Sequence, residues 1–355
     1  MLIAQWAAYR LEFLETAITS RQQMQVKDTY FVRVFDPLNP GVFGVGECPL
    51  FKGLSAEDDD CYEAMLSQAC HVVSTCPSES ISLKCVPEIS SIRFGFEMAL
   101  NDYAAGGTRR FFDSEWTDGT TRQQINGLVW MGDYRTMAAR IRQKLDNGFR
   151  CVNLKIGGID FNEELALLRL IRSEFGSDKV ELRLDANGAF TPQNAFDRLD
   201  RLASFDIHSI EQPVKPGQWR LMADLCKESP IPIALDEELI GFHSDSWKRE
   251  MLETVRPHYL ILKPALCGGF AQASRWIDLA RQYGIGWWAT SALESNLGLD
   301  AIGQWVSQFA PTMPQGLGTG QLYANNIPSP VYVDGQYIAR NPLLPYDLSA
   351  IKWRT

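Results

Sequence analysis

Apolar and polar residues follow a repeating pattern from about residue 123 onward. Short apolar runs, rich in β-branched and aromatic residues, are each followed by a turn and a helical pattern. The runs lie at residues 125–131, 150–156, 180–186, 206–212, 231–237, 258–264, 284–290 and 315–320. Between them apolar residues recur every three or four positions, as at Leu165, Leu168, Ile171 and Phe175. Such alternation predicts parallel strands joined by right-handed helical crossovers.

These repeated strand–helix units predict an α/β fold, a closed (β/α)8 barrel of the TIM type over residues 121–320. A doubly wound open sheet is the alternative, but no predicted strand leads into the Gly-rich turn of a dinucleotide site. The carboxyl ends of barrel strands normally carry the catalytic groups. Candidate catalytic residues are therefore expected at the carboxyl ends of the apolar runs.

The two ends of the chain differ in texture from the repeat. Residues 1–120 combine apolar runs at 30–35 and 41–51 with later helical patterns, which predicts an α+β capping domain in front of the barrel. After residue 321 the repeat stops, and short β-like runs with Pro and Asp-Gly follow. We expect residues 321–355 to return to the capping domain and complete it.

Composition and charge argue against some classes of binding partner and cellular location. The 355 residues carry a net charge of −9 and no Lys/Arg-rich run, which argues against nucleic acid. No stretch reaches eighteen consecutive apolar residues, so we expect no membrane span. The eight cysteines include no C-x-x-C pair and predict reduced, mostly buried thiols of a cytoplasmic protein. Oligomeric state leaves no signal in the sequence.

Three consecutive predicted strands end in a carboxylate: Asp185 in LRLDANGAF, Glu211 in SIEQP and Asp236 in IALDEE. Each could simply cap the following helix, as Asp often does after a strand. Three in register, however, would aim at one barrel mouth, where like charges raise one another's pKa unless a cation lies between them. Oxygen ligands with no His or Cys nearby favour Mg²⁺, with Mn²⁺ as a substitute.

Two other predicted strands end in a lone lysine, Lys155 and Lys263. In an eight-stranded barrel these strands lie opposite each other, so the two ammonium groups would face across the mouth. Two structural ion pairs are the alternative. Partial desolvation beside a metal would lower both pKa values, as a general base requires. Such a set fits proton abstraction next to a metal-bound substrate carboxylate.

The rest of the chain carries motifs in a consistent order. They read GVGECPLFKGLS, FGFEMALND, INGLVWMG, LDANGAF, IEQP, ALDEE, LKPALCGG and SALESNLGL. In this order the chain resembles the enolase superfamily, and within its muconate-lactonising subgroup it is similar to the o-succinylbenzoate synthases. The similarity extends over nearly the whole chain.

This resemblance implies Asp185, Glu211 and Asp236 as Mg²⁺ ligands, Lys155 as the base and Lys263 as its partner opposite. It also implies a menaquinone-pathway reaction, loss of water from 2-succinyl-6-hydroxy-2,4-cyclohexadiene-1-carboxylate to give o-succinylbenzoate. Lys155 would take the α-proton and then help the hydroxyl to leave, while Lys263 would stabilise the enediolate. An N-acylamino acid racemase or dipeptide epimerase would use the same lysine pair. A Schiff-base aldolase built on Lys263 and an inactive scaffold are more distant alternatives.

Substrate contacts are expected from residues beside these groups. The resemblance points to Gly268, Gly269, Thr290 and Ser291 for the succinyl end, and Asn187 is a further candidate. Residues 51–54 would close over the substrate and exclude water. The partner is thus a small-molecule carboxylate.

One departure from the subgroup occurs at the second predicted strand. The subgroup usually reads Lys-x-Lys there, whereas this chain has Asn153, Leu154 and Lys155. The loss of a neighbouring positive charge predicts a pKa for Lys155 that is lowered less than usual. The metal and base positions remain intact.

Overall fold

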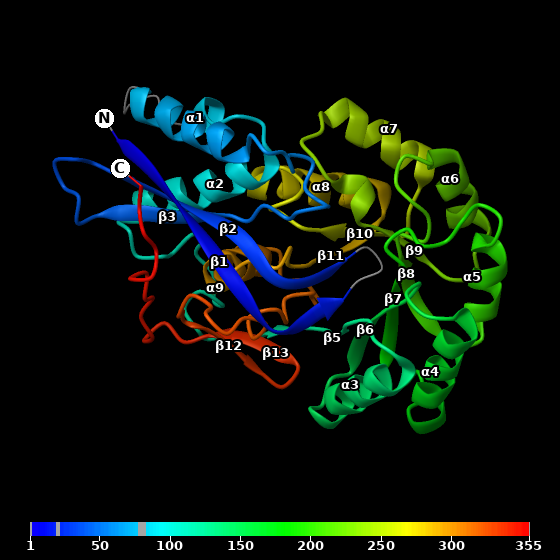
Figure 1. The fold of residues 1–355 in the computed structure, drawn as a ribbon. Coiled ribbons are helices and arrows are strands. Elements are labelled where there is room, and N and C mark those ends of the chain that lie inside the picture. Colours follow the sequence, from blue (N-terminus) through cyan, green and yellow to red (C-terminus); the bar gives the residue numbers. More distant parts are fainter. Residues whose placement is uncertain (1, 19–21, 77–82, 355) are drawn as a thin grey trace.

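The computed structural model describes residues 2–18, 22–76 and 83–354. The N-terminal part contains an antiparallel sheet in the order β1-β2-β3, covered by two helices (Figure 1). These elements are β1 (Ile3–Ile18), β2 (Gln23–Phe35), β3 (Phe43–Cys48), α1 (Tyr62–Thr75) and α2 (Ser90–Ala104). β1 lies outside the elements predicted from the sequence, because its apolar residues do not alternate strictly: Trp6 and Ala7 are adjacent and both buried.

A parallel sheet forms the larger part of the molecule, in the order β11-β10-β9-β8-β7-β6-β5. Each strand lies within a predicted apolar run, and helices follow the strands along the chain (Figure 1). The strands are β5 (Gly127–Val129), β6 (Cys151–Lys155), β7 (Glu181–Asp185), β8 (Ile207–Glu211), β9 (Ile233–Leu235), β10 (Tyr259–Leu262) and β11 (Gly286–Ala289). The helices are α3 (Tyr134–Asp146), α4 (Phe161–Glu174), α5 (Ala195–Ala203), α6 (Trp219–Glu228), α7 (Asp245–Val255), α8 (Gly269–Tyr283) and α9 (Asn296–Ser307).

The eighth predicted run touches both edges of this sheet. Gly316 forms a parallel bridge with Thr290 beyond β11, and Gln315 forms one with Ile125 before β5. The backbone N–H of Gly316 donates to Ala289 over 2.8 Å, and that of Asn126 donates to Gln315 over 2.9 Å. The run is thus too short to be a regular strand, yet it hydrogen-bonds to the two edge strands.

The C-terminal tail forms one antiparallel bridge with β1, between Tyr323 and Phe13, but adds no regular strand to its sheet. The backbone N–H of Ala324 donates to Glu12 over 2.8 Å, and that of Arg354 donates to Trp6 over 2.9 Å. The hairpin of the tail, β12 (Val331–Asp334) and β13 (Tyr337–Arg340), pairs instead with β4 (Gln123–Gln124). The tail therefore links the N-terminal sheet to the start of the parallel sheet.

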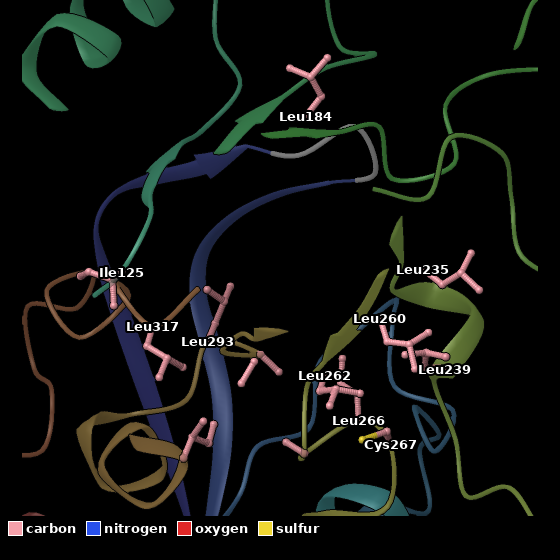
Figure 2. Packing of buried hydrophobic residues seen from close by; sticks show 14 of the residues in the cluster. Ile125, Leu184, Leu235, Leu239, Leu260, Leu262, Leu266, Cys267, Leu293 and Leu317 are labelled. Carbon is pink, nitrogen blue, oxygen red and sulfur yellow. The ribbon is translucent and has the colours of Figure 1, made fainter. Parts of the chain in front are cut away.

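Buried aliphatic residues hold the parallel sheet against its helices and loops. Leu260 and Leu262 of β10 belong to the same buried cluster as Leu266, Leu293 and Leu317, which come from loops (Figure 2). All five side chains are at most 5% exposed. This packing leaves little room for movement where the strands end.

The structure bears on two predictions from the sequence, the state of the cysteines and the absence of a membrane span. The prediction of reduced thiols is wrong for Cys76 and Cys85, which form a disulfide. Sequence spacing alone gave no sign of the pair, because spacing along the chain does not show which residues lie together in space. Of the six free cysteines, five are buried and Cys61 is exposed, in keeping with the prediction of mostly buried thiols. Among the described residues, none of the helices combines the length and apolar character needed to cross a bilayer.

Glu97 of α2 connects the N-terminal part to the parallel sheet. Its buried carboxylate accepts hydrogen bonds from the backbone N–H groups of Phe270 and Ala271, in the first turn of α8. Gly269 has a φ of +89°, and a Cβ there would come within 2.6 Å of Glu97 Oε2. Burial raises the pKa of Glu97 to about 7, although these hydrogen bonds oppose the shift.

Replacing Glu97 by Gln should change how stability depends on pH. The pKa of Glu97 is about 7 in the folded protein and 4.5 ordinarily, so the folded state binds the proton more tightly. The stability that this adds to the wild type is fully present below pH 4.5 and is lost as the pH rises to 7. Relative to Glu97→Gln, wild-type unfolding free energy should fall by up to about 3 kcal/mol across this window. Urea unfolding at about pH 5 and about pH 8 measures it.

Glu163→Gln, at an exposed position of α4, is the matched control and should show no such trend. A difference between wild type and Glu97→Gln that is equal at both pH values would contradict the prediction.

Candidate active site

The five charged residues predicted from the sequence all lie where parallel strands end. Lys155, Asp185 and Glu211 are the last residues of β6, β7 and β8, and the register pairs Lys155 with Asp185 and Asp185 with Glu211. Asp236 and Lys263 follow β9 and β10 directly. Three strands separate the two lysines in the sheet order.

Lys155 binds the neighbouring strand through its ammonium group. Its Nζ donates to Asp185 Oδ2 over 2.6 Å and to Asn187 Oδ1 over 3.1 Å. Asn187 adopts a left-handed φ of +44°, which lets its backbone N–H donate to Asp185 Oδ1 over 2.9 Å. Its amide also donates to Glu237 Oε1 over 3.1 Å. The turn after β7 therefore orients both the carboxylate and the lysine.

Lys263 makes the corresponding contacts on the other side. Its Nζ donates to Asp236 Oδ2 and lies 4.0 Å from Glu211 Oε1. Burial opposes its charge, but Asp236 and Glu211 outweigh burial and raise the pKa of Lys263. The lowered pKa was expected for a lysine that lies beside a bound metal ion, and it stays a prediction for that state.

The pKa values of Glu211 and Asp185 are shifted in opposite directions. Burial, followed by the charges of Asp185 and Asp236, raises the pKa of Glu211 well above its ordinary value. Burial also acts on Asp185, but the Lys155 ammonium outweighs it and holds the pKa of Asp185 below its usual value. All three acids are at most 5% exposed. If all three carboxylates were ionised, the two ammonium groups would leave one negative charge without a counter-charge, in keeping with the raised pKa of Glu211.

The three carboxylates are candidate ligands of a metal ion. In the described parts of the chain, no three His, Cys, Asp or Glu side chains are already arranged around a metal position. Oxygens of Asp185 and Asp236 are engaged by lysines instead. The chemistry of the set still fits a hard divalent cation, because the buried ligand atoms are all carboxylate oxygens.

A cavity opens beside these groups. It is lined by Lys155, Asp185, Asn187, Glu211, Lys263, Thr290 and Ser291 among the predicted site residues. Phe51 and Leu54 also line it, as expected of a covering loop. The structure therefore brings most of the predicted residues to one cavity.

Three predicted residues do not line this cavity: Asp236, Gly268 and Gly269. Asp236 is 2% exposed and bonded to Lys263, so it lies behind that lysine. A Cβ on Gly268 would meet Gln272 and Phe242, and one on Gly269 would meet Glu97. Both glycines thus permit close packing at the start of α8, and their contact with substrate stays a prediction.

Sequence reasoning missed part of the lining. Asn126, Leu128, Trp130, Leu293 and Thr319 also face the cavity, and Lys155 Nζ lies 5.9 Å from the centre of the Trp130 ring. Leu128 and Trp130 lie in the first predicted strand, and Thr319 lies in the eighth. Their position in the predicted strand–helix repeat was the available signal, but apolar and hydroxyl side chains gave no sign of a chemical role.

The wall formed by Ser291 and Leu293 is held by hydrogen bonds. Ser291 Oγ donates to Glu294 Oε2 over 2.6 Å and accepts from the backbone N–H of Leu293 over 2.9 Å. Leu293 has an unusual φ of +62°, and Tyr323 Oη donates to its carbonyl over 2.8 Å. A strained, buried turn of this kind persists only when its surroundings fix it.

Glu47, in strand β3 of the N-terminal sheet, holds the start of α9, which follows this wall along the chain. Its buried carboxylate accepts from Ser295 Oγ over 2.6 Å, from the backbone N–H of Ser295 over 2.9 Å and from Gly298 N–H over 3.1 Å. The anion therefore lies at the N-terminus of α9, where the helix dipole favours it. Lys27 Nζ is buried nearby and has no hydrogen-bond partner among the described residues.

Comparison with known proteins shows the family of the chain. The family described as "Enolase C-terminal domain-like" matches residues 136–341. The chain therefore belongs to the enolase superfamily. It is 56% identical over 245 residues to o-succinylbenzoate synthase of Desulfotalea psychrophila, which is 69% of this chain and 66% of that protein.

Solved structures extend the likeness over almost the full length. The crystal structure of MenC from Desulfotalea psychrophila has a TM-score of 0.79 and 41% identity, covering 95% of this chain and 99% of that one. N-succinylamino acid racemase of Amycolatopsis is 26% identical over 90% of this chain and 87% of its own length. A dipeptide epimerase from Cytophaga hutchinsonii, solved with Mg and a dipeptide, shares the fold with a TM-score of 0.83 at 21% identity, over 100% of this chain and 99% of its own.

Replacing Glu47 by Gln should weaken the attachment of α9. The change removes the charge at the helix N-terminus, turns one acceptor into a donor that faces N–H groups, and leaves Lys27 with less counter-charge. We expect a loss of about 2–3 kcal/mol in unfolding free energy, measured by urea titration. Glu15→Gln, at a side chain that is 81% exposed, should change stability by less than about 0.5 kcal/mol. Equal effects of the two changes would contradict the role given to Glu47.

Proposed function

We propose that this protein is a Mg²⁺-dependent dehydratase that converts 2-succinyl-6-hydroxy-2,4-cyclohexadiene-1-carboxylate into o-succinylbenzoate in menaquinone biosynthesis. Two lysines and three carboxylates at one end of the parallel sheet carry the proposal, and four of these five residues line one cavity. This set suits removal of a proton next to a carboxylate. The 56% identity to an o-succinylbenzoate synthase supports the choice of reaction, whereas the racemase relative reaches 26%.

The architecture in this proposal is a closed (β/α)8 barrel over residues 121–320. The bridges of Gln315 to Ile125 and of Gly316 to Thr290 support closure, because they join the two edges of the parallel sheet. Residues 1–120 would form the capping domain, and residues 321–355 would return to it. The lining by Phe51 and Leu54 supports a cap that contributes to the cavity.

Asp185, Glu211 and Asp236 would hold Mg²⁺. When bound, the ion supplies positive charge to the substrate carboxylate, which makes the adjacent α-proton more acidic. Its charge would also balance the excess of carboxylates and release the lysines from ion pairs with Asp185 and Asp236. Occupation of the site would therefore free the amines for chemistry.

Lys155 is the proposed base and acid. Its neutral amine takes the α-proton from C1, and the resulting ammonium then protonates the hydroxyl on C6. The C6–O bond breaks, water leaves, and the electrons of the C–H bond form the C1–C6 double bond of the aromatic ring. Lys263, on the far side of the mouth, would stabilise negative charge on the carboxylate while the proton is away.

The remaining wall would hold the substrate. Asn187, Thr290 and Ser291 line the cavity and offer hydrogen-bond groups, and Phe51 and Leu54 would exclude water above it. The substrate is a small-molecule carboxylate in this proposal.

The function can be tested directly. Purified protein with Mg²⁺ should convert the cyclohexadiene substrate into an aromatic product, followed by its ultraviolet absorbance. The protein would instead be a racemase or epimerase if it formed no aromatic product but exchanged the α-proton of N-acylamino acids or dipeptides in D₂O with inversion.

Lys155→Met should lower kcat by about a thousandfold or more, because it removes the base while keeping an unbranched side chain. Steady-state kinetics measures the effect. Lys215→Met, at an exposed position, is the control and should keep wild-type rates. Residual activity of Lys155→Met within tenfold of wild type would exclude this lysine as the base.

Removal of Mg²⁺ with EDTA should abolish turnover, and added Mg²⁺ should restore it. Independently of activity, Mg²⁺ at a hundredfold excess over its Kd should stabilise the wild type by about 2.7 kcal/mol, seen as a rise in Tm. Glu211→Gln should lose this stabilisation because a ligand charge is missing. A wild-type Tm that does not respond to Mg²⁺ would contradict a site built from these carboxylates.

A further inference from the structure

Two cavity-lining residues carry a buried side-chain oxygen without a hydrogen-bond partner among the described residues: Asn153 Oδ1 and Thr319 Oγ1. Asn153 is 8% exposed and Thr319 is 4% exposed. Folded proteins rarely leave such groups unpaired, because a buried polar atom loses its bonds to water. In the wall of a substrate cavity, the missing partner is naturally a group of the substrate.

Asn153 lies on the same strand face as the proposed base. Side chains of a strand alternate between its two faces, so Asn153 and Lys155 of β6 both face the cavity, and both line it. Asn153 lies two residues before Lys155 and is therefore further from the carboxyl end of β6. Of its two cross-strand neighbours, Leu128 lines the cavity but offers no hydrogen bond. The other, Arg183 of β7, donates to Glu181 Oε1 and to the carbonyl of Pro314 instead.

The chemistry of the proposed substrate limits what Asn153 Oδ1 can bind. A carboxamide oxygen only accepts hydrogen bonds. The two carboxylates and the ketone of the substrate also only accept. The hydroxyl on C6 is the one donor of the substrate, and it is the group that leaves.

We propose that Asn153 is a substrate-positioning residue whose side-chain oxygen accepts a hydrogen bond from the departing C6 hydroxyl. This inference rests on the proposed dehydratase function. The bond fixes the hydroxyl proton toward Asn153 and turns an oxygen lone pair toward the Lys155 ammonium. When the C6–O bond breaks, the oxygen takes its second proton from Lys155 and departs as water that still donates to Asn153.

This role makes a specific prediction about two successive steps. Proton removal from C1 needs Lys155, whereas loss of water also needs the hydroxyl to be oriented. Without Asn153, Lys155 should still remove the proton but return one from solvent more often than it expels water. Substrate recovered from D₂O should then carry deuterium at C1.

The experiment compares Asn153→Leu, which has nearly the same shape and no acceptor, with the wild-type holoenzyme. Both are incubated with substrate and Mg²⁺ in D₂O and stopped at partial conversion. Mass spectrometry then measures deuterium in the remaining substrate and the amount of product. We expect kcat to fall about tenfold or more, and the ratio of exchange to product to rise by about tenfold or more.

Three further variants separate this role from a structural one. Thr319→Val removes the other unpaired oxygen and should alter KM while keeping the wild-type ratio. Asn153→Ser restores an acceptor and should return the ratio to within about threefold of wild type. If Asn153→Leu does not fold, as judged by circular dichroism, Asn153→Ala takes its place in the same measurement.

A fall in turnover without a rise in the exchange ratio would overturn the role of Asn153. So would an equal rise in Thr319→Val, since that would indicate a general loss of packing. Failure of the proposed function has a different signature, because the wild type itself would then form no aromatic product.

Discussion

The ion pair between Lys155 and Asp185 joins the ends of two neighbouring strands inside a buried wall, over 2.6 Å. With Asp236, Glu211 and Lys263 it forms a set in which three anions face two cations. Such a set is costly to bury unless every charge has a partner. Burial raises the pKa of Glu211, and the charges of Asp185 and Asp236 add to this shift, so this end of the sheet favours a cation.

The N-terminal part supports this site through two glutamates. Glu97 accepts hydrogen bonds from the first turn of α8, and Glu47 does the same at α9. Each uses a carboxylate at a helix N-terminus, where backbone N–H groups lack partners within the helix. The loop between β11 and α9, which includes Ser291 and Leu293, is thereby held from outside the parallel sheet. The shape of the cavity thus depends on elements far from it in the sequence.

Much of the fold was predictable because strands and helices of the parallel sheet repeat with their own hydrophobic periods. Every strand from β5 to β11 lies within a predicted apolar run, and the charged residues at their ends were visible as exceptions to that pattern. β1 was not visible in this way, since a strand that is buried on parts of both faces has no strict alternation. The Cys76–Cys85 disulfide was likewise missed, because spacing along the chain does not reveal proximity.

The sequence by itself determined which residues end the strands, because the period of the side chains is a local property of the backbone. It therefore identified Lys155, Asp185, Glu211, Asp236 and Lys263. Only the tertiary structure decided which partner each charge has, that Asp236, Gly268 and Gly269 lie outside the cavity lining, and that Asn153 Oδ1 lacks a partner. Burial, hydrogen-bond satisfaction and pKa depend on groups brought together from distant parts of the chain, and no local pattern records them.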